Sequence, residues 1–111
     1  MSDRNPKLLV EDILESCHKI REYTEGMTFE MFVADSKTID AVVRNFEIIG
    51  EAANRLPEDF KNLHQEIDWF RIRGFRNRLV HDYFGIDHSI VWQVKETYLS
   101  QLITNLEKIP P

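Results

Sequence analysis

The stretch DSKTIDAVVRNFEIIGEAANRLP, from Asp35 to Pro57, decides the fold of this chain. Its apolar residues recur every three or four positions, so they would lie along one face of an α-helix. These residues are Ile39, Val42, Val43, Phe46, Ile49, Ala53 and Leu56. Asp35 and Ser36 provide a capping signal at the start of the helix, and Pro57 ends it. The stretch predicts a long amphipathic helix with one buried face.

The remaining segments follow the same helical pattern, and no strand-like alternation occurs. Helices are predicted after Pro6 as far as Gly26, over residues 68–85, and as one unbroken element over residues 87–110. The polar segment 57–68 predicts one or two helical turns. These elements predict an all-α bundle of four main helices plus a short helical segment, with neighbours roughly antiparallel because the connections are short. Apolar surface left over in such a small bundle predicts a homodimer.

The composition indicates a folded protein with limited basic surface. The chain has 111 residues, of which 42% are hydrophobic, 11% aromatic and 30% charged. A chain of this length forms one core, so residues 1–111 are expected to be a single domain. The charges comprise 14 Lys and Arg against 19 Asp and Glu, a net charge of −5. That balance argues against a general basic coat, so any nucleic-acid site must be local.

Several kinds of chemistry lack the residues that they need. The single cysteine, Cys17, excludes an internal disulfide and fits a reducing compartment, and its place on an apolar helical face favours a structural role. The glycines form no phosphate-binding loop, and the histidines show no metal-binding spacing of three or four residues. Neither a cofactor nor a metal is therefore expected. Charges interrupt every apolar stretch, which predicts a cytoplasmic chain without a membrane partner.

One arginine-rich stretch stands out in this acidic chain. The segment RIRGFRNRLVHDY, residues 71–83, holds four arginines and then His81 and Tyr83. A solvated helix face is the plain interpretation of such a charge run. However, every cation in the stretch is an arginine, whose planar, permanently charged group suits phosphate. Histidine can give or take a proton near neutral pH, so the stretch predicts a local anion-binding site with acid–base capacity.

Helical geometry limits how these side chains can act together. On an ideal helix Arg76 and His81 lie about 140° apart around the axis and about 7.5 Å apart along it. They do not share a face, whereas Asn77 and His81 do, as do Arg76 and Tyr83. Joint action of Arg76 and His81 needs a long arginine reach, a helix end near His81, or a second copy of the helix. A two-fold dimer would place two of each in one cleft.

The run from Arg76 to Tyr83 resembles the signature of the HEPN superfamily, in which an arginine precedes a histidine by four to six intervening residues. A polar residue usually follows the arginine directly, and Asn77 fills that position. Tyr83, two places after His81, and the segment Arg44–Ala53 resemble the HepT-like branch of the superfamily. The resemblance extends over nearly the whole chain and includes Trp69, Gly74 and Trp92.

This resemblance implies a HEPN helical bundle that dimerises so that both copies of the motif line one cleft. Members of the branch are typically toxins of prokaryotic two-gene modules and act as metal-independent endoribonucleases. Their usual partner is a minimal nucleotidyltransferase antitoxin, and the motif tyrosine carries AMP in some members. The resemblance therefore implies RNA as the substrate, such an antitoxin as the partner, and Tyr83 as the site of AMPylation.

The predicted chemistry needs no protein nucleophile, because RNA supplies its own in the 2′-hydroxyl. Arg76 and His81 are the predicted catalytic residues. His81 would serve as general base or acid, and Arg76 would bind the scissile phosphate and stabilise its developing charge. Asn77 would orient His81 or a phosphate oxygen, and Arg73 and Arg78 would steer the RNA.

Structural alternatives stand beside these roles. His81 could be a helix-end histidine, Tyr83 a core aromatic residue and Asn77 a surface residue. Glu47 and Glu51, one turn apart on the predicted helix, could hold an arginine near the cleft, but a structural role is favoured and the catalytic set omits them. As a whole, the chain could be a non-catalytic helical module that binds a nucleotide or docks a nucleotidyltransferase.

Overall fold

The computed structural model describes residues 5–82 and 85–110, and the regular structure of these residues is entirely helical. In chain order the helices are α1 (Pro6–Tyr23), α2 (Phe29–Val33), α3 (Ser36–Arg55), α4 (Glu58–Leu63), α5 (Trp69–His81), α6 (His88–Thr97) and α7 (Leu99–Glu107). The all-α prediction is confirmed. The count differs from four main helices and a short segment, since α2 was not predicted and the last helix is divided in two.

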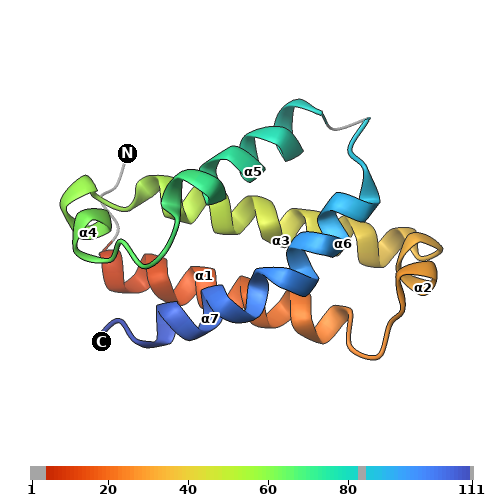
Figure 1. Ribbon diagram of the computed structural model, residues 1–111, viewed down its shortest axis with the longest axis horizontal. Helices are drawn as coiled ribbons and strands as arrows, with labels where there is room; N and C mark the ends of the chain where they lie inside the picture. Colours follow the sequence, from red (N-terminus) through yellow and green to blue (C-terminus); the bar gives the residue numbers. More distant parts are fainter. Residues whose placement is uncertain (1–4, 83–84, 111) are drawn as a thin grey trace.

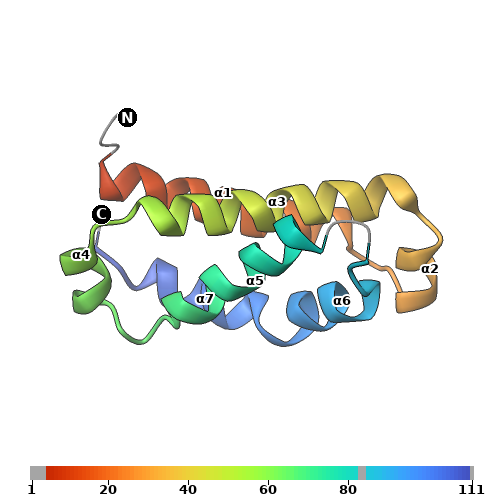
Figure 2. The same cartoon turned by 90° about the horizontal axis from the view of Figure 1, so that it is seen from above.

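Two layers of helices make up the molecule. The long helices α1 and α3 run antiparallel and pack side by side (Figure 1), and together they form one layer (Figure 2). The second layer holds α5 and the consecutive helices α6 and α7 (Figure 2). In this arrangement α3 packs against both α1 and α5, and α7 packs against α1. The start of α1 and the end of α7 lie at the same end of the bundle (Figure 1).

The core forms between these layers, and α3 contributes the largest share of it. Its predicted apolar face is buried, with only Val43 partly so. The completely buried apolar residues, each with 0% exposure, are Ile13, Cys17, Ile20, Phe32, Val42 and Val91. They come from α1, α2, α3 and α6, so the apolar stripes of helices far apart in the sequence meet in one core. Their burial is the main force that holds the bundle together.

The helices begin at caps that the sequence indicates. Asp35 accepts a hydrogen bond from the Thr38 backbone N–H at 3.1 Å and another from the Thr38 hydroxyl at 2.9 Å. Asp87 likewise accepts bonds from the Ser89 backbone N–H and hydroxyl, at 2.9 and 2.7 Å. These hydrogen bonds to the ionised carboxylates lower the pKa of both aspartates. The predicted start signals of α3 and α6 are therefore confirmed.

The chain between α1 and α3 contains the helix that the periodicity did not reveal. Gly26 turns the chain after α1 with a φ of +75°, a conformation that glycine adopts without strain. Thr28 then caps the five-residue α2, since its hydroxyl accepts a hydrogen bond from the Met31 N–H at 3.2 Å. Phe32 of α2 packs against Trp92 with ring centroids 5.2 Å apart. A helix this short has too few residues to display a 3.6-residue repeat.

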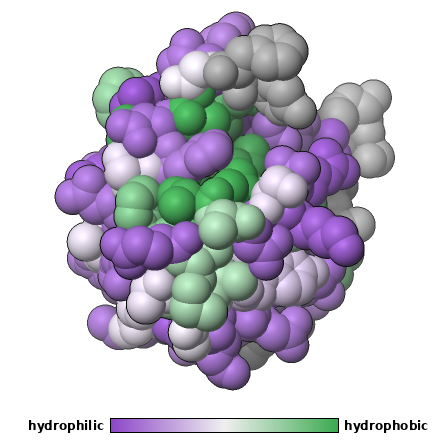
Figure 3. Space-filling view, turned by 90° about the vertical axis from the view of Figure 1, so that its right-hand side faces the viewer, coloured by the Kyte–Doolittle hydropathy of each residue, from purple (hydrophilic) through white to green (hydrophobic). Residues whose placement is uncertain are grey.

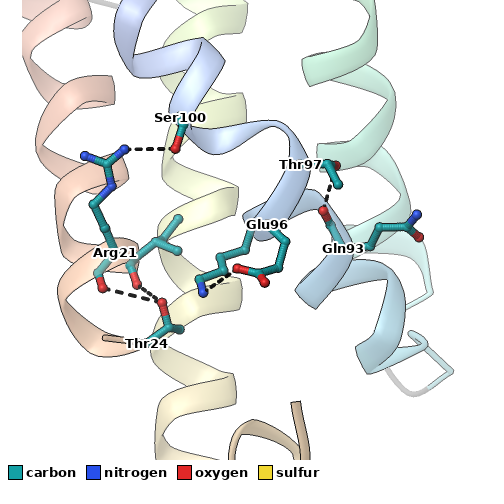
Figure 4. A network of polar contacts seen from close by, with 8 residues as sticks. Arg21, Thr24, Gln93, Glu96, Thr97 and Ser100 are labelled. Atoms are coloured by element: carbon teal, nitrogen blue, oxygen red, sulfur yellow. Dashed lines mark hydrogen bonds and ion pairs between the residues drawn. The ribbon is translucent and has the colours of Figure 1, made fainter. Parts of the chain in front are cut away.

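The prediction of one unbroken helix over residues 87–110 is wrong, because the chain bends at Tyr98 between α6 and α7. The Thr97 hydroxyl donates to the Gln93 carbonyl at 2.7 Å, a back-bond that bends helices (Figure 4). On the far side of the bend, Arg21 of α1 donates to the Ser100 hydroxyl at 3.1 Å (Figure 4). The bend and this contact help to align α7 with α1.

The end of the molecule that carries α2 is partly apolar on its surface. Apolar side chains gather there in a strip surrounded by hydrophilic ones (Figure 3). Two apolar residues of α2, Met31 and Val33, are 51% and 40% exposed. Elsewhere, Phe70 and Val80 of α5 are exposed at 85% and 43%. The bundle thus leaves apolar surface on both α2 and α5.

Candidate active site

The arginine-rich segment of the sequence forms α5, which is held mainly on one side. Asp68 caps its start by accepting a hydrogen bond from the Arg71 N–H at 3.1 Å. Only Ile72 and Leu79 of this helix are fully buried. The Phe75 ring meets the Phe46 ring of α3 edge to face, with centroids 5.2 Å apart. Packing against α3 therefore fixes α5, while most of its polar side chains stay accessible.

The two helices approach closely where Arg76 of α5 lies against Gly50 of α3. A Cβ atom placed on Gly50 would lie closer than 3.0 Å to both Cβ and Cγ of Arg76, and 3.5 Å from its Cδ. Ordinary carbon contacts are about 3.5–4.0 Å. Glycine is therefore needed at position 50 for the backbones to approach this closely. The same contact fixes the aliphatic stem of Arg76 against α3.

The charged end of Arg76 is held by Glu51 of α3, the helix that also contributes Gly50. An Arg76 Nη2 group donates to Oε2 of Glu51 at 2.9 Å. The other carboxylate oxygen of Glu51 lies 3.5 Å from Nη2 of Arg55, one turn further along α3. Of these side chains, Arg76 is 30% exposed and Glu51 48% exposed. The glutamate that was expected to have a structural role therefore binds the arginine that was predicted to be catalytic.

A groove of about 430 Å³ runs beside this contact, between α1, α3 and α5. Its wall carries as many cationic as carboxylate side chains. The charged residues of the groove are Asp12, Glu15, Lys19, Arg44, Glu47, Glu51, Arg55 and Arg76. Because the whole chain has a net charge of −5, this balanced lining repels an anion less than the average surface does. Glu47 shares the groove with Glu51.

The other arginines of α5 point to different surroundings. Arg73 lines a groove beside α4 and the end of α3, whereas Arg78 lines one between α5 and the α6–α7 pair. The Arg71 guanidinium lies over the Tyr98 ring, 5.8 Å from its centroid. Successive residues turn by about 100° on a helix, so the arginines are distributed around α5. The structure thus divides the basic stretch of the sequence between several grooves.

His81 is exposed and is the last residue of α5. Asn77, partly buried, precedes it by one turn, so the two residues share a side of the helix. Since α5 is continuous from Arg76 to His81, the ideal-helix separation of about 140° applies to these two residues within one chain. The structure therefore brings Arg76 to Glu51 and not to His81. Tyr83, predicted to carry AMP, lies outside the described residues.

Comparison with known proteins identifies the chain through a family model described as "Ribonuclease HepT-like", which matches residues 13–109. This chain belongs to the HepT-like family. The match spans α5 completely, including Arg76, Asn77 and His81. The HEPN-type fold expected from the sequence is confirmed by this membership together with the all-helical structure.

Curated relatives of the HepT-like chain support the same assignment over at least 90% of their own length. A "Probable ribonuclease HepT" of Thermococcus cleftensis is 42% identical over 106 residues, which cover 96% of each chain. A "Putative RNase" of Caldanaerobacter subterraneus subsp. tengcongensis is 41% identical over 95% of this chain and 90% of its own. Another "Putative RNase", of Methanocaldococcus jannaschii, is 38% identical over 98% and 90%. No solved structure matches the chain.

The single cysteine of this HepT-like chain lies in the core and does not line the groove. Cys17 is completely buried, and its burial raises the pKa of its thiol to about 12, so it stays protonated.

Within residues 5–82 and 85–110, no three His, Cys, Asp or Glu side chains gather as a metal site would require. No helix in the described part of the chain has the length and apolar character to cross a membrane.

The sequence pattern gave too little weight to two residues that contact Arg76. Gly50 and Glu51 are adjacent in the chain, and both contact Arg76 from α3. The pattern placed Glu51 near the cleft but gave no way to pair it with a particular arginine. The available signal was a glycine within the longest helix, where it costs about 1 kcal/mol relative to alanine and therefore indicates a close contact.

Proposed function

We propose that this HepT-like chain is a metal-independent endoribonuclease and the toxin of a two-gene toxin–antitoxin module in the cytoplasm. The observation that carries the proposal is the family match, which extends through the whole of α5 and includes Arg76 and His81. Two features of the molecule support it. Arg76 borders a groove in which carboxylates do not dominate, and His81 is exposed at the end of the same helix.

In the proposed reaction the substrate supplies the nucleophile. The 2′-hydroxyl attacks the adjacent phosphorus while the bond to the 5′-oxygen of the next nucleotide breaks, which leaves a 2′,3′-cyclic phosphate and a 5′-hydroxyl. His81 takes the proton from the 2′-hydroxyl or gives one to the leaving oxygen. Arg76 binds the non-bridging oxygens and stabilises the charge that develops on them, in a position that its contacts with α3 already fix.

Three residues of α5 assist this reaction in the proposal. Asn77 orients His81 or a phosphate oxygen from one turn away on the same side of the helix. Arg73 and Arg78 bind the RNA backbone on either side of the reacting phosphate. Their positions in separate grooves support contact with an RNA that wraps part of the way around α5.

The proposed active unit is a homodimer. Because Arg76 and His81 lie about 140° apart on one helix, a second copy of α5 is the simplest way to bring an arginine and a histidine to the same phosphate. Apolar side chains exposed on α5, Phe70 and Val80, support an interface on or beside this helix. The site would then contain two copies of each catalytic residue.

The proposed partner is a minimal nucleotidyltransferase antitoxin that transfers AMP to Tyr83. Tyr83 follows His81 by two positions, so the adduct would lie close to the end of α5. It would add a negatively charged phosphodiester next to the site that binds RNA. Like-charge repulsion and bulk would then exclude the substrate phosphate.

The proposal is tested by RNA cleavage in EDTA with protein shown by intact mass to carry no adduct. Total tRNA and mRNA are incubated with the parent, with His81→Ala and with His18→Ala, a control that removes an exposed histidine of α1. We expect the parent and His18→Ala to produce 2′,3′-cyclic phosphate ends, and His81→Ala to lose about 10²–10⁴-fold in rate. Undiminished cleavage by folded His81→Ala would refute the assignment of His81.

Absence of cleavage by the parent would favour the alternative, a non-catalytic module that binds a nucleotide or docks a nucleotidyltransferase. Such a module would retain its partner in a pull-down after His81→Ala. The apolar groove of about 450 Å³ between α5 and the α6–α7 pair offers a surface for that role. The two functions are therefore separated by one enzyme assay and one binding assay.

A further inference from the structure

The Glu51 carboxylate joins two arginines that are distant in sequence. Its Oε2 atom accepts a hydrogen bond from Arg76 of α5 at 2.9 Å, and its Oε1 atom lies 3.5 Å from Nη2 of Arg55. Arg55 and Glu51 are one turn apart on α3, so this half of the cluster is set by the helix itself. The other half depends on the close approach of α5 at Gly50. The tertiary fold thus assembles a cluster of two guanidinium groups around one carboxylate.

The charge and geometry of this cluster suit a phosphodiester. Two guanidinium groups and one carboxylate carry a net charge of +1, in a chain whose overall charge is −5. Each guanidinium has five N–H donors, and contact with Glu51 occupies only part of each group. The Arg55 and Arg76 side chains are 42% and 30% exposed, and both line the same groove. Donors from both arginines can therefore reach an anion that enters the groove.

The carboxylate also limits how the two arginines can move. An isolated arginine side chain samples many rotamers, and fixing it on a ligand costs free energy. Because Glu51 contacts both groups before any ligand binds, their separation and orientation are largely set in advance. A phosphodiester presents two non-bridging oxygens, much as a carboxylate presents two oxygens. The guanidinium N–H groups that bind the two oxygens of a carboxylate therefore also have the geometry to bind a phosphodiester placed next to it.

We infer that Arg55 is a second phosphate-binding residue of this chain, and that Glu51 is a positioning residue that orients Arg55 and Arg76 together. The ligand is an RNA phosphodiester at or next to the scissile bond. This inference rests on the proposed function, since it takes Arg76 as the arginine of the cleavage site. It assigns the two residues different effects: Arg55 acts on binding, whereas Glu51 acts on the geometry of the reacting complex.

The experiment compares Arg55→Ala and Glu51→Gln with Arg44→Ala as the matched control. Arg44 lies on the same helix and lines the same groove, about 16 Å from Arg55 along the axis. Steady-state cleavage of a defined RNA gives KM and kcat for each variant. Anisotropy with the same sequence as 2′-O-methyl RNA, which has no free 2′-hydroxyl to attack, gives Kd without turnover. Urea midpoints establish that each variant is folded.

We expect Arg55→Ala to raise KM and Kd about tenfold with kcat within about threefold of the parent, because an ionic hydrogen-bond donor is lost. Arg44→Ala should change Kd by less than about threefold. Glu51→Gln should lower kcat about tenfold or more while Kd stays equal or falls, since removal of a negative charge favours RNA but releases Arg76. Glu51→Asp, which keeps the charge on a shorter stem, should recover part of kcat.

Equal effects of Arg55→Ala and Arg44→Ala on Kd would overturn the assignment of Arg55, because general groove charge would then explain both. A rise in KM with unchanged kcat in Glu51→Gln would overturn the positioning role. Failure of the proposed function appears differently, as a parent protein that does not cleave RNA or a folded Arg76→Ala that cleaves normally. The Kd comparison on 2′-O-methyl RNA still tests Arg55 in that case.

Discussion

Substitution of Gly50 by alanine tests the close approach of α3 and α5 that places Arg76. Two opposing terms decide the change in the free energy of unfolding. Alanine is favoured over glycine inside a helix by about 0.8–1.0 kcal/mol. Against this, the new Cβ would lie closer than 3.0 Å to two side-chain carbons of Arg76, so α5 must move by about 1 Å to reach ordinary contact.

Overpacking of this kind costs about 1–3 kcal/mol, and rotation of Arg76 cannot remove it because one of the crowded atoms is its Cβ. The net expectation for Gly50→Ala is a loss of about 1 kcal/mol, which corresponds to a fall in Tm of about 4 °C for a chain of this size. A shift of α5 also disturbs the contact between Arg76 and Glu51. We therefore expect RNA cleavage to decrease by more than the loss of folded protein explains.

Gly74 provides the matched control, since it also lies inside a helix but a Cβ added to it would meet no atom within 4 Å. Gly74→Ala should raise stability by about 0.5–1 kcal/mol through helix propensity alone. Urea unfolding and thermal melts of both variants measure the difference. If Gly50→Ala stabilises the protein as much as Gly74→Ala, the reasoning about the helix contact is refuted.

Three further outcomes follow from the structure. Gly26→Ala should lower stability by about 1–2 kcal/mol in urea unfolding, because alanine is strained at a φ of +75°; an unchanged midpoint would contradict this. The lowered pKa of Asp35 and Asp87 means that their stabilising caps are present above the unfolded-state pKa of about 3.9 and are lost as the pH falls through the folded-state values. Melts from pH 5 to pH 2 should therefore show a steep acid decline that Asp35→Asn with Asp87→Asn makes shallower, and an equally steep decline in this variant would refute the account. RNA binding should weaken strongly between low and high salt, since local arginines must supply the attraction in a chain of net charge −5; anisotropy independent of salt would argue against it.

On the proposed function, the balance of charge in the groove would direct RNA to one part of a small acidic protein. The net charge of −5 repels phosphate overall, whereas the groove beside Arg76 has as many cations as carboxylates. Binding to RNA would then depend on a few arginines held in fixed positions. Single substitutions of those arginines should have larger effects than in a protein with a broadly basic surface.

Local sequence patterns were sufficient for the main helices and their starts. Side-chain spacing along residues 35–57 predicted the buried face of α3, because helix periodicity is a property of the backbone that does not depend on neighbours. Asp35 and Asp87 marked helix starts for the same reason, since a cap bonds to N–H groups two or three residues away. The family motif in α5 was likewise contained in a short run of sequence.

Contacts between distant residues could not be obtained in this way. The bend at Tyr98 interrupts a stripe whose periodicity continues on both sides, and α2 is too short to show a repeat. The basic stretch of α5 appeared as one patch in sequence, yet helical rotation and packing distribute its arginines between separate grooves. Which groove each arginine faces depends on where the other helices lie.

The amino-acid sequence by itself determined the helical class, the positions of the long helices and the residues of the α5 motif, because each depends on interactions within a few residues. Only the tertiary structure decided that Gly50 admits Arg76 and that Glu51 connects it with Arg55. Arg76 and Glu51 are 25 residues apart, and their contact exists only because α3 and α5 cross at a glycine. Such a contact is fixed by the packing of two surfaces, which no single stretch of sequence contains.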